Sequence, residues 1–179
     1  MEDGDAWTAG IPECAWTDVD QVMMQLALAE ARAAAAEAEV PVGAVVAQGE
    51  RVLATAHNRR ERAQDPTAHA ELLAVRAAAA RVGSWRLQGT TVYATLEPCP
   101  MCAGALWLAR VQRLVYAAAD EKAGAAGTLY NVVADRRLNH RIEVASGLLA
   151  EESRVLLRSF FVGRRRKSDA GPAAPAGGA

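Results

Sequence analysis

Two short strings of the sequence hold residue types that bind metal ions and move protons. One is DPTAHAE at positions 65–71, and the other is TLEPCPMC at positions 95–102. Cys99 and Cys102 are three residues apart, so on a helix the two thiols share one face. With the imidazole of His69 they offer two sulfur atoms and one nitrogen atom, a mixture that suits zinc. The sequence therefore predicts one zinc ion held by His69, Cys99 and Cys102.

The acid Glu71 follows His69 by two positions, and residues two apart on a helix do not face each other. We therefore expect its carboxylate to stay out of the coordination shell and to face a substrate. Three protein ligands leave one tetrahedral position for water, and zinc lowers the pKa of such a water from 15.7 to about 7. Glu71 could take its proton and pass it to a ring nitrogen and then to departing ammonia. This chemistry is hydrolytic deamination.

A structural zinc site is the alternative, because a cysteine pair at this spacing also occurs where zinc only supports the fold. Such a site wants four protein ligands, and Cys14, His57 or His140 could be the fourth. It gives no reason for an acid to stand two residues after His69. The His-x-Glu string followed by a Pro-Cys-x-x-Cys string favours the catalytic site.

The elements predicted around these strings are those of an α/β domain. We expect helices from a capping box at Thr17 and Asp20 to about Ala38, over 68–81, from Pro98 or Pro100 to about 109, and over 150–161. Strands are expected over 41–47, 51–56, 91–96, 113–117 and 141–144, and a long loop with one short helical turn over 118–139. The order predicts a three-layer α/β/α fold with a mixed central sheet of about five strands.

The two ends of the chain differ in composition from the region between them. We predict a disordered acidic arm over 1–15, one folded domain over 16–167 and a disordered Gly/Pro/Ala tail over 168–179. No apolar run approaches the roughly 20 residues that span a bilayer, and three cysteines argue against a disulfide framework. We therefore expect a soluble cytoplasmic protein that does not enter membranes.

Charge is distributed unevenly along a chain whose formal net charge is −1. Residues 1–20 hold six acids and no Lys or Arg, whereas a run without acids near the end is basic: Arg158, Arg164, Arg165, Arg166 and Lys167. This run could bind phosphates, although a solvated charged face is the ordinary alternative. Phe160 and Phe161 precede it and could stack an unpaired base, with core packing as their alternative role.

Taken together, these motifs resemble the cytidine deaminase superfamily, and within it the bacterial tRNA-specific adenosine deaminases. The likeness runs from about Val22 to Arg166, and it is densest at 39–44, 65–71, 95–104 and 124–127. The resemblance implies a cytidine-deaminase-like fold, catalytic zinc on the His69, Cys99 and Cys102 ligands, and Glu71 as the proton shuttle.

The same resemblance implies conversion of adenosine to inosine at the wobble position of the tRNA anticodon. It implies a homodimer in which the partner subunit frames each active site, with zinc and no organic cofactor. Asn58 would hydrogen-bond the flipped nucleotide and Asp120 would contact the ribose, while turn capping and a solvated loop acid remain the alternatives for the two. The other residues that we assign to substrate binding are Ala70, Phe160, Arg164, Arg165 and Arg166.

Two other functions share the same residues. One is deamination of a free base or nucleoside, of the cytosine or guanine type, because the metal chemistry is common to these enzymes. The other is a non-catalytic RNA-binding protein that uses zinc for folding alone. Substrate size separates the first from tRNA deamination, and a role for Glu71 in turnover separates the second.

Overall fold

A computed structural model describes residues 16–169 of the chain, with side chains described as far as residue 165. The predicted acidic arm over 1–15, which includes Cys14, lies outside the described residues, as does the tail from residue 170 onward. The domain predicted over 16–167 thus falls within the part that the structure describes.

Ten helices and strands make up the described part of the chain. They are α1 (Asp18–Ala36), β1 (Gly43–Gln48), β2 (Arg51–His57), α2 (Arg60–Ala63), α3 (Ala70–Val82), β3 (Thr91–Leu96), α4 (Pro100–Leu108), β4 (Arg113–Ala118), β5 (Glu143–Ser146) and α5 (Ala150–Asp169). The five strands form one sheet in the order β2-β1-β3-β4-β5. None of the helices between residues 16 and 169 has the length and apolar character needed to cross a membrane.

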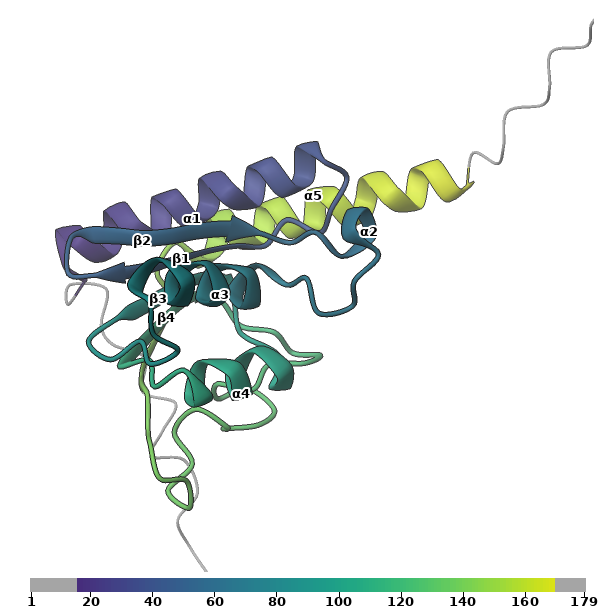
Figure 1. Ribbon diagram of the computed structural model, residues 1–179. Helices are drawn as coiled ribbons and strands as arrows, with labels where there is room; N and C mark the ends of the chain where they lie inside the picture. Colours follow the sequence, from purple (N-terminus) through teal and green to yellow (C-terminus); the bar gives the residue numbers. More distant parts are fainter. Residues whose placement is uncertain (1–15, 170–179) are drawn as a thin grey trace, which may run out of the picture.

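The sheet is mixed and lies between two layers of helices. β1 pairs antiparallel with both β2 and β3, whereas β3, β4 and β5 run parallel. Helices α1 and α5 lie on one face, and α3 and α4 lie on the other (Figure 1). These observations confirm the predicted three-layer α/β/α fold with a central sheet of five strands.

Alternation along the strands explains why both faces carry helices. In β1, Val46 belongs to the core under α3 and α4, whereas Val45 belongs to the core under α1. In β4, Leu114 and Val115 divide between the two cores in the same way. Successive side chains of a strand point to opposite faces, so a strand that is apolar throughout must be covered on both.

Helix α1 begins where the sequence predicts, because Thr17 and Asp20 form the capping box. The Asp20 carboxylate also accepts hydrogen bonds from the Tyr93 hydroxyl at 2.9 Å and from Arg113 Nη1 at 2.6 Å. Gly43 opens β1 directly beneath this helix, and a Cβ atom there would overlap the Ala27 carbonyl oxygen. The charge network and the missing side chain together fix α1 close against the sheet.

Several elements differ from the predicted ones. Helix α5 ends at Asp169 rather than near Phe161, because good helix formers continue through the basic run. β5 lies two residues later than predicted, at 143–146, and the short helix α2 was not predicted. The helical turn expected within 118–139 was wrong: this segment holds turns and one isolated bridge between Ala126 and Asn131.

Candidate metal and catalytic site

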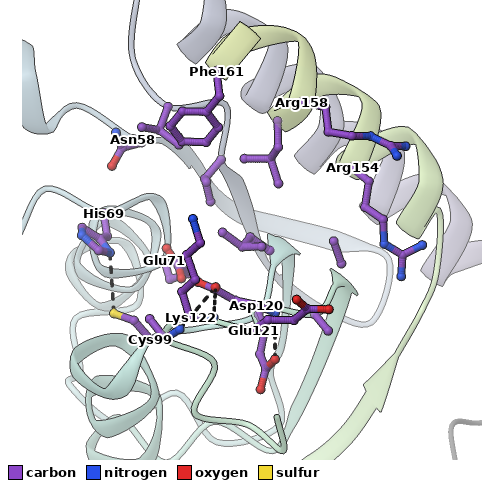
Figure 2. A pocket seen from close by; sticks show the side chains of 18 of the residues that line it. Asn58, His69, Glu71, Cys99, Asp120, Glu121, Lys122, Arg154, Arg158 and Phe161 are labelled. Carbon is purple, nitrogen blue, oxygen red and sulfur yellow. Dashed lines mark hydrogen bonds between the residues drawn. The ribbon is translucent and has the colours of Figure 1, made fainter. Parts of the chain in front are cut away.

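Three strand ends bring the two motif strings to one edge of the sheet. β2, β3 and β4 point in the same direction, since β1 is antiparallel to β2 and β3 while β4 is parallel to β3. A cavity of about 810 Å³ lies at their carboxyl ends, within the range of ligand pockets. Asn58 follows β2, Cys99 follows β3 and Asp120 follows β4, and all three line this cavity (Figure 2).

The three predicted metal ligands converge at one end of the cavity. His69 is the N-cap residue of α3 and Cys99 is the N-cap residue of α4. Each thus lies directly before its helix, whereas the sequence predicts His69 inside a helix over 68–81. His69 Nδ1 lies 3.7 Å from Cys99 Sγ and 3.6 Å from Cys102 Sγ. The three ligand atoms lie within 4.8 Å of one another, which fits a single ion. The positive ends of both helices also face this corner.

Hydrogen bonding within the trio shifts the pKa of each of the three side chains. The hydrogen bond with Cys102, followed by that with His69, lowers the pKa of the Cys99 thiol to about 4. The same contact with Cys99, together with burial, raises the pKa of Cys102. The hydrogen bond to Cys99 raises the pKa of His69 in turn. The lowered pKa favours the thiolate form of Cys99, and thiolate and imidazole groups are the ligands that zinc takes.

The acid Glu71 lies in the first turn of α3 and lines the cavity with only 4% of its surface exposed. Burial raises the pKa of its carboxyl group. Among the described residues, the group of possible metal ligands consists of His69, Cys99 and Cys102 and does not include Glu71. The acid thus lies beside the metal corner and remains available to a molecule in the cavity (Figure 2).

The alternative fourth ligands are committed elsewhere. His57 Nδ1 lies 2.7 Å from Glu30 Oε2, and its Nε2 lies 3.5 Å from Glu37 Oε2. His140 Nε2 lies 2.7 Å from the backbone carbonyl oxygen of Val111. The third alternative, Cys14, lies outside the described residues. Within residues 16–169, no fourth protein side chain completes a closed structural site.

The structure places Asn58 at the cavity wall and gives its amide a buried partner. Asn58 is 5% exposed, and its Nδ2 donates to Glu39 Oε2 at 2.9 Å. Its backbone N–H donates to the Val42 carbonyl oxygen at 3.0 Å. Asn58 therefore takes part in the backbone turn and also lies at the cavity wall. Its capping role and its substrate-facing role do not exclude each other.

Asp120 also lines the cavity, but its carboxylate caps its own loop. Oδ1 accepts hydrogen bonds from the backbone N–H groups of Lys122 at 2.9 Å and Ala123 at 3.3 Å. The backbone N–H of Asp120 donates to Glu97 Oε2 at 3.1 Å. Asp120 Oδ1 thus holds the loop that forms one wall of the cavity.

Glu97 organises the whole of this loop from beneath. It is 1% exposed, and it accepts hydrogen bonds from the backbone N–H groups of Asp120, Ala126 and Thr128 and from the Thr128 hydroxyl. A Cβ atom at Gly124 would overlap the Glu97 carboxylate, which explains the glycine. Because Pro98 alone separates Glu97 from Cys99, this acid links the loop directly to the metal corner.

Helix α5 supplies the opposite wall. Arg154, Leu157, Arg158 and Phe161 line the cavity, and their offsets of three, four and seven residues from Arg154 place them on one side of the helix. Figure 2 shows the Phe161 side chain extending from this helix. Phe160 is not among the residues that line the cavity, and its ring meets that of Phe161 edge-on at 5.4 Å. The helical period explains why Phe161, which is 46% exposed, and not the assigned Phe160, lines the cavity.

The remaining assigned residues lie around the cavity rather than inside it. Arg164 and Arg165 line a neighbouring cavity of about 650 Å³ that shares Lys122, Arg158 and Phe161 with the first. The Arg164 guanidinium lies 5.7 Å from the centre of the Phe160 ring. Ala70 is buried between two cavity residues on α3, and the Arg166 side chain is outside the described set.

Sequence reasoning did not assign roles to Glu39 and Glu97, although both are essentially unexposed. Lys122 and Arg154 at the cavity wall were also missed. A signal existed for the two acids, because each interrupts or flanks an apolar string, and a buried charge needs several partners. Their partners lie 19 to 31 residues away, which no local pattern indicates.

Comparison with known proteins agrees with the geometry of the site. A model of the MafB19-like deaminase family matches residues 18–165. The chain is 47% identical over 151 residues to the tRNA-specific adenosine deaminase of Bacillus subtilis (strain 168), covering 84% of this chain and 94% of the relative. This chain belongs to the tRNA-specific adenosine deaminases. A member from Haemophilus influenzae is 43% identical and covers 84% of this chain and 88% of its own length.

Solved structures place this tRNA-specific adenosine deaminase chain within the same fold. One, from a study of A-to-I editing by tRNA:A34 deaminases at the wobble position of transfer RNA, is 43% identical, with a TM-score of 0.73 over 76% of this chain and 99% of the other. Guanine deaminase from Nitrosomonas europaea is 27% identical, with a TM-score of 0.65 over 79% of this chain and 84% of the other. The closer agreement with the tRNA enzyme favours the nucleic-acid branch.

Proposed function

We propose that this protein converts adenosine to inosine at the wobble position of the tRNA anticodon by hydrolytic deamination. The observation that carries the proposal is the convergence of His69, Cys99 and Cys102 beside the buried Glu71, in a cavity walled by a basic helix. The 43% identity to a wobble-position deaminase of known structure supports the choice of substrate. We also propose that the reaction takes place in the cytoplasm.

We propose zinc as the only cofactor. His69 Nδ1 and the sulfur atoms of Cys99 and Cys102 would hold one ion, since one imidazole and two sulfur ligands match a catalytic zinc site with one open position. When bound, zinc acts as a Lewis acid that makes water a usable nucleophile near neutral pH.

The Glu71 carboxylate carries the protons in this proposal. It accepts one from the attacking water, whose oxygen forms a bond to C6 of adenine, and it donates that proton to N1. The carboxylate then transfers a second proton from the added hydroxyl group to the amino nitrogen, after which the C6–N bond breaks and ammonia leaves. Burial of Glu71 keeps bulk water away from the acid during both transfers.

The walls of the cavity fit one nucleotide taken out of its stack. Phe161 and Leu157 offer apolar surface, and Arg154, Arg158 and Lys122 offer positive charge beside it. An aromatic ring next to basic side chains binds an unpaired base and the adjacent phosphates. Arg164 and Arg165 extend the positive charge past the cavity, where a stem-loop RNA could continue.

The test of this function is incubation of purified, zinc-loaded protein with its own tRNA pool, followed by sequencing that reads inosine as guanosine. We expect inosine at the first anticodon position and at no other adenosine. Release of ammonia from free guanine or cytosine, with the tRNA adenosine unchanged, would contradict the proposal and support a small-molecule deaminase.

We further propose that the protein is a homodimer that associates through α4 and the loop after β4. Exposed apolar side chains gather on these two segments, namely Met101, Leu108, Leu129 and Tyr130. Residues on either side of α4 are joined to this loop by hydrogen bonds from Ala125 N to the Pro98 carbonyl oxygen and from Arg110 to Asn139. Leu108→Glu should convert a dimer to a monomer in sedimentation experiments, and an unchanged mass would refute this interface.

A further inference from the structure

The buried acid Glu39 lies between α1 and β1, and its side chain accepts hydrogen bonds from the cavity residue Asn58 and from two backbone N–H groups of α2. Its side chain is fully buried, and its oxygens accept from the Arg62 N–H at 2.7 Å, the Asn58 amide at 2.9 Å and the Glu61 N–H at 3.3 Å. A buried carboxylate is tolerated when donors surround it, and every one of these partners is a donor. Glu39 therefore holds Asn58, Glu61 and Arg62 in place.

The contact with Glu39 determines which end of the Asn58 amide faces the cavity. A carboxylate only accepts, so Asn58 must turn its NH₂ group toward Glu39 and its Oδ1 atom the other way. Figure 2 shows the amide oxygen on the side of His69 and the nitrogen turned away. The backbone on either side is also held, because Asn58 N donates to Val42 O and Arg59 N donates to Ala68 O.

We propose that Glu39 is a positioning residue for this reaction, which locks the Asn58 amide so that the cavity wall presents a hydrogen-bond acceptor to the nucleotide. The inference rests on the proposed function and adds a specificity rule to it. The ring nitrogens of adenine only accept hydrogen bonds, so they cannot pair with Asn58 Oδ1, which is also an acceptor. Asn58 Oδ1 therefore selects a substrate that offers an N–H or O–H group at this wall. A nucleotide with an acceptor there would leave two buried acceptors facing each other.

The experiment exchanges the hydrogen-bond donor and acceptor between positions 39 and 58, and it keeps an acceptor oxygen facing the cavity. In the double variant Glu39→Gln with Asn58→Asp, the new amide NH₂ group at position 39 donates to residue 58, and the amide oxygen at position 39 still accepts from Arg62. The second oxygen of residue 58 still faces the cavity. Asn58→Ala is the matched baseline, because it removes the acceptor without adding charge. Asn58→Asp alone places two carboxylates within hydrogen-bonding distance and lacks the compensating change.

Deamination of an anticodon stem-loop RNA is measured for each zinc-loaded variant. We expect Asn58→Ala to lower kcat/KM by about 10-fold to 100-fold, mainly through KM, as for one lost substrate hydrogen bond. The double variant should remain at least about 10-fold more active than Asn58→Ala. A folded double variant no more active than Asn58→Ala would overturn the proposal, as would equal activity of Asn58→Ala and wild type.

Thermal melting separates this inference from the proposed function. In a double-mutant cycle, Glu39→Gln should raise the Tm of Asn58→Asp although it removes a buried acceptor, a result that depends on the pair and on no substrate. If wild type fails to deaminate the RNA while the cycle shows this rescue, the proposed function fails and the Glu39–Asn58 lock stands. Asp20→Asn, which removes another buried carboxylate away from the cavity, should lower Tm and leave KM unchanged.

Discussion

The metal corner and the substrate walls of the cavity are built in different ways. The metal corner takes His69, Glu71, Cys99 and Cys102 from two helix starts, each a single local string. The walls take Asn58, the loop after β4 and α5 from distant parts of the chain, and the buried acids Glu39 and Glu97 hold the first two in place. The residues of the metal corner thus come from short stretches of sequence. The walls that would bind the substrate depend instead on buried acids whose hydrogen-bond partners lie far away along the chain.

The largest effect should come from removing a sulfur ligand at the metal corner. Cys102 is fully buried and contacts His69, so Cys102→Ser should reduce zinc content to a small fraction of wild type and abolish deamination. Metal analysis and inosine formation measure the two effects together. Full activity in a zinc-free variant would show that the corner is not the catalytic centre.

A smaller effect is expected when the wall is loosened and the metal corner is left intact. Glu97→Gln replaces an acceptor-only side chain that holds three backbone N–H groups, so kcat/KM should fall by about 10-fold while zinc content stays near wild type. Steady-state kinetics and metal analysis measure both quantities.

Gly124→Ala provides an independent way to disturb the same wall, since its Cβ atom would overlap the Glu97 carboxylate. Similar kinetic losses in the two variants would attribute the effect to the loop rather than to one charge. If Glu97→Gln lost zinc in proportion to activity, the division into metal corner and wall would be wrong.

Charge on α5 should affect RNA affinity more than turnover. Arg158→Ala with Arg164→Ala should weaken tRNA binding by about 10-fold and lower the slope of log K against log salt by about 1.5, because fewer counterions are released. Titrations between low and physiological salt measure this slope. Arg137→Ala is the matched control, since Arg137 is highly exposed and lines neither of the two cavities. Equal slopes in all three proteins would remove α5 from the RNA interface.

The smallest effect on catalysis is expected at Asp20, which belongs to neither region. Burial opposes ionisation there, but the hydrogen bonds from Arg113 and Tyr93 lower the pKa of the carboxyl group. The resulting stability is present above about pH 4 and is lost as pH falls through the lowered pKa. Asp20→Asn should cost about 3 kcal/mol of unfolding free energy at about pH 7 and less below about pH 4, with kcat/KM unchanged. Denaturant titrations at several pH values measure this difference, and a gap that widened in acid would contradict it.

The sequence predicts the metal corner because its information is local. The spacing of Cys99 and Cys102 and the offset of Glu71 from His69 follow from helix geometry, and the structure places these side chains as that geometry requires. The apolar strands and the capping box likewise predict the three-layer fold.

The walls were less predictable because they depend on tertiary contacts and on helix phase. Phe160 and Phe161 both precede the basic run, so that position does not separate them, whereas the helical period from Arg154 and Arg158 selects Phe161. Glu39 and Glu97 carry no local signature of their distant partners. Helix α5 extends to Asp169 because the residues of the basic run have high helix propensity. This propensity outweighs the composition that favoured an earlier end of the helix and a tail.

The central claim is that an acid stands beside the metal ligands without being one of them. Its most direct test is Glu71→Ala, with inosine formation on tRNA and zinc per chain measured on the same preparation. The account predicts that the rate falls by about 10²–10⁴ or more while zinc content and Tm stay close to wild type. Undiminished deamination, or loss of zinc together with the carboxylate, would contradict it.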